Sequence, residues 1–125
     1  MCNSVYKATT KVPIYETKFA VVLCDDLLEG CEVLKDWFDI DKLNIDPTYS
    51  AAITMHGDEK LAIVFIRNSI SPNVIAHEIY HVTSHIMNFV GVKYDITNLE
   101  AFCYLNGWIT NWIYSKIYNK NKELK

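Results

Sequence analysis

The sequence has no long apolar run, and this excludes several classes of protein. Its longest uninterrupted apolar stretches, 19–24 and 61–66, are far too short to cross a bilayer. The N-terminal segment also has no apolar core of the kind that a secretory signal peptide needs. We therefore expect no membrane partner and a cytoplasmic location.

Cysteine pairs, excess basic charge and linker residues are missing as well. The four cysteines include no CxxC pair, so they do not build a zinc knuckle by themselves. We expect free thiols, although a disulfide between Cys24 and Cys31 is conceivable. Twelve basic residues face 15 acidic ones, and the net charge of −3 argues against a nucleic-acid partner. With 4 glycines and 3 prolines, no linker divides the chain. We predict a single domain over 1–125, with 1–17 as a loosely packed arm or a short edge strand.

The spacing of apolar residues predicts an α+β domain with the element order β-α-β-β-α-α. Ser71 and Pro72 are typical of a helix start, and Gly91 of a helix end. The stretch 49–55 has few large apolar groups, which is typical of an edge strand. The predicted elements are a strand over 19–24, a helix over 26–38 capped by Asp25 or Asp26, a hairpin of strands 49–55 and 61–67 around a turn at 56–59, a helix from 71 to about 90, and a helix over 97–118.

The segment His77-Glu78-Ile79-Tyr80-His81 carries the clearest chemical signal. Histidines at positions i and i+4 of a helix lie about 40° apart, so both rings can reach one metal ion. Glu78 flanks that position without lying between the rings, which suits a base that polarises a water molecule. This motif predicts a zinc site with Glu78 as the general base.

The rest of the predicted helix agrees with a metal-binding face. Its large apolar residues fall within about 40° of one line, which we interpret as the core-facing stripe. The two histidines lie on the other side of the helix and are predicted to face a cleft or the following helix. The predicted stripe contains Ile75, Ile79, Val82, Ile86 and Phe89.

A catalytic zinc site needs a third protein ligand, and Glu100 is the best candidate. Eighteen residues separate it from His81, which is enough to finish one helix and begin an antiparallel one. A rival interpretation is a capping box with Thr97, which would turn the Glu100 carboxylate away from a metal. His85 and Asp95 are alternative ligands, although Asp95 also suits a turn. Tyr104, one helical turn after Glu100, could donate a hydrogen bond to an oxyanion.

Two other residues have simpler interpretations. His56 is predicted to lie solvated in the hairpin turn. Cys103 is predicted to be a small buried group rather than a ligand.

The pattern HEIYH-x18-E resembles that of the gluzincin metallopeptidases, and the resemblance covers roughly residues 45–118. It is closest to minimal single-domain forms, such as short HExxH proteins of phage genomes. The resemblance implies a zincin-like domain in which His77, His81 and Glu100 bind zinc and Glu78 is the base. It also implies a sheet whose edge strand receives the substrate. The chain departs from the family where Leu99 takes the place of an Asn before the ligand Glu.

These observations predict a zinc-dependent peptidase that acts on a peptide or protein substrate. If the chain is encoded by a phage, its location is the host cytoplasm or the virion. One alternative is a catalytically inactive, zinc-stabilised structural or interaction protein, such as a virion component or a host-factor-binding protein. Another is a regulatory protease resembling those that cleave repressors.

Overall fold

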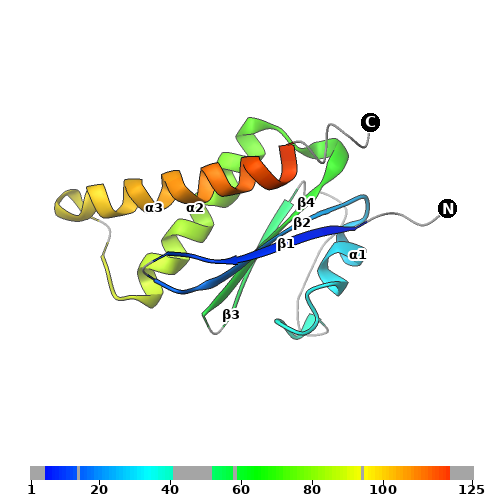
Figure 1. Cartoon of the computed structure of the whole chain (residues 1–125), viewed down its shortest axis with the longest axis horizontal. Helices are drawn as coiled ribbons and strands as arrows, with labels where there is room; N and C mark the ends of the chain where they lie inside the picture. The colour runs from blue at the N-terminus through cyan, green and yellow to red at the C-terminus, as the bar shows by residue number, and fades with distance from the viewer. Residues whose placement is uncertain (1–4, 14, 41–51, 58, 94, 119–125) are drawn as a thin grey trace.

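A computed structural model describes residues 5–13, 15–40, 52–57, 59–93 and 95–118 of the chain, and these residues form an α+β fold as predicted (Figure 1). Four strands make one mixed sheet in the order β1-β2-β4-β3. The elements are β1 (Tyr6–Lys11), β2 (Lys18–Cys24), α1 (Leu27–Glu32), β3 (Ala52–Gly57), β4 (Lys60–Ile66), the 3-10 turn η2 (Arg67–Ser69), α2 (Pro72–Phe89), the 3-10 turn η3 (Ile96–Asn98), α3 (Leu99–Ile113) and the π-helical turn η4 (Tyr114–Tyr118).

The two central strands are parallel, and the two outer strands run antiparallel to them. β2 pairs with β4 from Lys18↔Lys60 to Cys24↔Ile66, and β3 lies at the edge beyond β4. The predicted edge position of the first hairpin strand is therefore confirmed. Of the two alternatives predicted for residues 1–17, a loose arm or a short edge strand, the described residues form the edge strand, because Tyr6–Lys11 pairs with β2 along its whole length and Val12 is fully buried. The alternation of exposed and half-buried residues in β1 is that of an edge strand.

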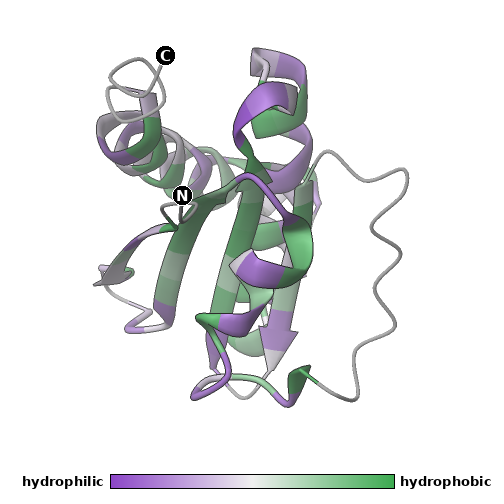
Figure 2. Cartoon of the chain, turned by 90° about the vertical axis from the view of Figure 1, so that its right-hand side faces the viewer, coloured by the Kyte–Doolittle hydropathy of each residue, from purple (hydrophilic) through white to green (hydrophobic). Residues whose placement is uncertain are grey.

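Helices cover both faces of the sheet. Alternate residues of β2 and β4 point to opposite faces, so these strands contribute to two cores and are apolar over residues 19–24 and 61–66 (Figure 2). Phe19, Leu61 and their face-mates pack against α2 and α3. Ala20, Val64 and their face-mates pack against α1. This two-sided burial is the physical reason that the predicted strand 19–24 reads as a continuous apolar run.

The helix α1 is shorter than predicted. It begins after Asp26, as expected, but the Asp26 side chain makes no cap hydrogen bond, and the helix ends at Glu32. Residues 33–37 are turns, yet Leu34 and Phe38 are buried against the same core. The helical spacing of apolar residues thus predicted the buried positions correctly, but the helix predicted from it is longer than the observed one.

The hairpin turn is tighter than predicted. The strand β3 continues through His56, which pairs with Leu61, to Gly57, which pairs with Lys60. Glu59 takes a positive φ of 55° at the turn. His56 therefore belongs to the edge strand and not to the turn, and the first part of the predicted strand, 49–51, lies outside the described residues.

The helix α2 begins and ends where its sequence signals predict. The Ser71 hydroxyl accepts a hydrogen bond from the amide of Val74, at 3.2 Å, and Pro72 is the first helical residue. After Val90, Gly91 takes a φ of 77°, a conformation that glycine adopts without strain. Phe89 was predicted to be core and is 38% exposed, because it lies at the last helical position. The other members of the predicted stripe are all buried.

We expect Ser71→Ala to lower the free energy of unfolding by about 0.5–2 kcal/mol, because it removes the cap acceptor. Urea unfolding followed by circular dichroism measures the change. Ser69→Ala, at an exposed serine two residues earlier, is the matched control and should change stability by less than about 0.5 kcal/mol. Equal effects of the two substitutions would contradict a capping role for Ser71.

Candidate metal centre

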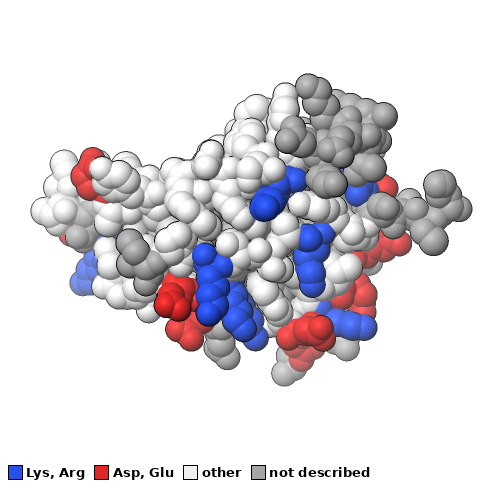
Figure 3. All heavy atoms as spheres, viewed as in Figure 1, with Lys and Arg blue, Asp and Glu red and all other residues white. Residues whose placement is uncertain are grey.

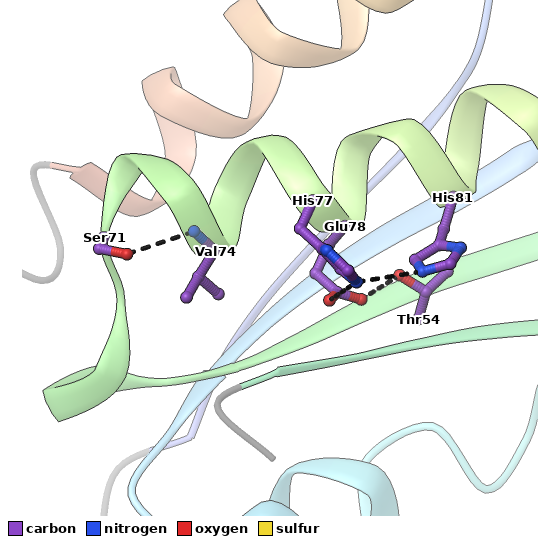
Figure 4. Close-up of polar contacts among 6 residues, drawn as sticks. All are labelled: Thr54, Ser71, Val74, His77, Glu78 and His81. Carbon is purple, nitrogen blue, oxygen red and sulfur yellow. Dashed lines mark hydrogen bonds and ion pairs between the residues drawn. The ribbon is translucent and has the colours of Figure 1, made fainter.

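The side chains of His77, Glu78 and His81 point from α2 toward the edge strand β3 (Figure 4). The two Nε2 atoms lie 3.3 Å apart, and the ring centroids lie 4.9 Å apart. Both histidines are exposed, as their position opposite the core stripe predicts. The i, i+4 spacing on a regular helix brings the two rings together without any distortion of the backbone.

The separation of the two nitrogens is compatible with a shared zinc ion. Two nitrogens bound to one tetrahedral zinc ion at about 2.0–2.1 Å lie roughly 3.3–3.4 Å apart. The observed Nε2–Nε2 distance of 3.3 Å matches this value. Imidazole is a preferred ligand type for zinc. His77 and His81 therefore fit two positions of one zinc coordination sphere.

Glu78 is held at this site by the edge strand. Its side chain is mostly buried, with the residue only 7% exposed, and its Oε1 accepts a hydrogen bond of 2.6 Å from the Thr54 hydroxyl of β3. Its Oε2 lies 3.9 Å from the Nε2 of His77. One carboxylate oxygen is thus anchored to the sheet while the other lies beside the histidines. Sequence reasoning missed Thr54, although its place in the predicted edge strand was a usable signal.

Neither Glu100 nor Tyr104 is brought to the histidines. Thr83 of α2 donates a hydrogen bond to Asn106 of α3, at 2.9 Å. At about 100° per residue, Thr83 and His81 lie about 160° apart around α2. α3 therefore packs on the far side of α2 from His81. Of the two surroundings predicted for the histidines, a cleft or the following helix, the second is not the one observed.

No three or more His, Cys, Asp and Glu side chains gather into a metal-binding group within the part of the chain that the structure describes. Glu100 is exposed in the first turn of α3. The amide of Thr97 donates to the Asp95 carboxylate, at 2.7 Å, so Asp95 forms the turn before α3. The role of Glu100 as a ligand stays a prediction based on spacing and resemblance.

Tyr104 lies in a different environment from the one predicted for it. It is 75% exposed and borders an apolar pocket of about 470 Å³ between α3 and the β1–β2 connection. Charged side chains are few over α3 on the face shown in Figure 3 and gather instead over the sheet and α1. The pocket is lined by Val12, Pro13, Tyr15, Ala101, Tyr104, Leu105 and Trp108.

Cys103, predicted to be buried, is also exposed, because the buried stripe of α3 runs along another face.

A second pair of histidines lies next to the first. The rings of His56 on β3 and His85 on α2 are stacked, with centroids 4.0 Å apart and planes 26° apart. Partial burial lowers the pKa of His85, and the neighbouring His56 and His81 lower it further. Sequence reasoning placed His56 in a solvated turn and so missed this contact.

Comparisons with known proteins do not assign the chain to a family. No protein-family model, no curated protein and no solved structure matches the chain. Among the helices of the described residues, none has both the length and the hydropathy needed to span a membrane.

Proposed function

We propose that the protein is a zinc-dependent peptidase that hydrolyses a peptide bond with Glu78 as the general base. The observation that carries this proposal is the 3.3 Å separation of the Nε2 atoms of His77 and His81, which is compatible with a shared zinc ion. The anchored carboxylate of Glu78, beside these two rings, supports it further.

The chain's own residues have distinct roles in this proposal. His77 and His81 would hold the zinc ion, which when bound would act as a Lewis acid and lower the pKa of a coordinated water molecule to about 7. Glu78 takes a proton from the attacking water and returns it to the leaving amine. Thr54 holds Oε1, so that the carboxylate keeps one orientation through both proton transfers. A Lewis acid and a fixed base are the two groups that metal-assisted amide hydrolysis uses.

The substrate is proposed to bind along β3. This strand is the last in the sheet order of the described residues, and Thr54 in its middle contacts the general base. An extended peptide that adds to this edge would form backbone hydrogen bonds with β3. Its peptide bonds would then lie next to Glu78.

Glu100 remains the proposed third ligand because of its spacing from His81 and the gluzincin resemblance. To reach the histidines it would require α3 to change its packing on α2, since Glu100 is now exposed. His85 and Asp95 are the alternatives. Tyr104, 75% exposed, would need the same rearrangement to assist an oxyanion.

Metal content tests the proposal directly. We expect elemental analysis to find one zinc ion per chain in the wild-type protein and none in His81→Ala, because one imidazole alone does not hold the ion. Glu100→Ala should also lose zinc if Glu100 is the third ligand. If Glu100→Ala keeps its zinc, His85 or Asp95 becomes the proposed third ligand. If His81→Ala keeps its zinc, the proposed site itself is wrong. Circular dichroism of each variant controls for unfolding.

One observation favours a second candidate function. Glu100 and Tyr104 lie away from the histidines, so the oxyanion donor expected for turnover is not beside them, an arrangement that suits a metal-binding role without turnover. In that case a chelator would lower the melting temperature, while a library of peptides would remain uncleaved. Cleavage that stops on chelation and returns with zinc favours the peptidase.

A further inference from the structure

All four histidines of the chain gather on one side of the molecule. Three lie on successive turns of α2, where the His77 and His81 rings are in contact and His85 follows. The fourth, His56, comes from β3 and stacks on His85. The two elements are separated in sequence, so only the packing of α2 along β3 produces this gathering.

Like the contact between Thr54 and Glu78, the contact between His56 and His85 joins β3 to α2. Thr54 and His56 are two residues apart on a strand and point to the same side of the sheet. Each meets a side chain of α2, through a 2.6 Å hydrogen bond in one case and a 4.0 Å ring stack in the other. His56 is exposed and His85 is half-buried. The second pair therefore stays accessible to an ion from solvent.

We propose that His56 and His85 form a second metal site, which binds Ni²⁺ or Cu²⁺. Two imidazoles favour these ions over Mg²⁺ and Ca²⁺, which prefer oxygen ligands. The ring centroids lie 4.0 Å apart, and the ring planes are 26° apart. Stacked rings direct their nitrogen lone pairs along nearly parallel planes, so chelation would require both side chains to turn about their χ torsions until one nitrogen of each faces the same ion at about 2.0–2.1 Å.

The proposed site is separate from the one at His77 and His81. The backbone positions of His77 and His85 differ by about 12 Å along α2, at about 1.5 Å per residue. An ion held by His56 and His85 would lie at one end of this row of histidines, and an ion held by His77 and His81 at the other. Where His85 serves the second site, the third ligand of the first site would be Glu100 or Asp95. Water molecules would complete the coordination of the second ion. The proposal thus does not depend on whether the first pair binds zinc.

Nickel titration of a variant that lacks the first pair tests the second. Isothermal titration calorimetry of His77→Ala/His81→Ala with NiCl₂ should show one ion bound per chain. Adding His85→Ala or His56→Ala should weaken nickel binding by about tenfold or more, because a single imidazole lacks a second ligand held nearby at high effective concentration. His85→Phe keeps a stacked aromatic ring without a ligand nitrogen and should lose binding to the same extent.

Two outcomes would overturn the proposal. One is that the His77→Ala/His81→Ala protein, folded by circular dichroism, binds no nickel. The other is that His56→Ala and His85→Phe leave its nickel affinity unchanged, which would place the ion elsewhere. Loss of nickel binding in His85→Phe would support the second site even if zinc content is insensitive to His81→Ala, so failure of the peptidase proposal is distinguishable from failure of this one.

Discussion

Glu78→Gln is expected to lower kcat for peptide hydrolysis by about 10²–10⁴-fold while the zinc content stays at the wild-type level. The amide has nearly the shape of the carboxylate and can still accept a hydrogen bond from Thr54. It cannot take a proton from the attacking water. Glu78 is not a proposed ligand, so the histidine pair should keep its metal. Cleavage of a peptide library, together with elemental analysis of the same sample, measures both quantities.

Substitutions of Thr54 test whether its hydrogen bond positions the carboxylate of Glu78. Thr54→Val removes the hydroxyl that holds Oε1 and keeps the shape of the side chain, whereas Thr54→Ser keeps the hydroxyl. We expect Thr54→Val to lower kcat with little change in zinc content and Thr54→Ser to stay near the wild type. A wild-type rate for Glu78→Gln would sink the proposed mechanism. Equal rates for the two Thr54 variants would show that the hydrogen bond does not position the base.

Gly30→Ala is expected to destabilise the fold by about 1–3 kcal/mol, the usual cost of overpacking a core. Gly30 lies in α1, where the helix crosses the sheet. A Cβ at this position would lie 2.5 Å from the Sγ of Cys24 and 2.7 Å from a methyl carbon of Val64. Both neighbours are fully buried, so neither can move aside freely. Urea unfolding monitored by circular dichroism gives the change in free energy.

Gly107→Ala is the matched control for this prediction. Gly107 is also helical, in α3, and beyond its chain neighbours and its own helix backbone no heavy atom of the described residues lies within 4 Å of the added Cβ. Here the substitution should stabilise the protein by about 0.8–1.0 kcal/mol, because alanine has the higher helix propensity. Opposite signs for the same chemical change would confirm close packing of α1 on the sheet. A stabilising Gly30→Ala would contradict it.

Local sequence signals predicted most of the secondary structure. Ser71-Pro72 and Gly91 mark the ends of α2 because capping geometry depends on neighbouring residues alone. The apolar run 19–24 marks a strand buried on both faces. Predictions stayed open or failed where tertiary packing decided the outcome. The choice between an arm and an edge strand for the N-terminal residues was decided by the pairing of Tyr6–Lys11 with β2, and α1 stopped at Glu32 although its apolar spacing continued.

For the candidate site, the sequence by itself determined the local part. His77, Glu78 and His81 are close because helical geometry places i, i+1 and i+4 on adjoining positions, and their separation needs no other element. Only the tertiary structure decided which groups meet them. The packing of α2 along β3 brings Thr54 to Glu78 and His56 to His85, and the packing of α3 on the opposite side leaves Glu100 exposed. Sequence spacing shows how far the chain can reach, whereas the face on which a helix packs depends on apolar contacts summed over the whole core.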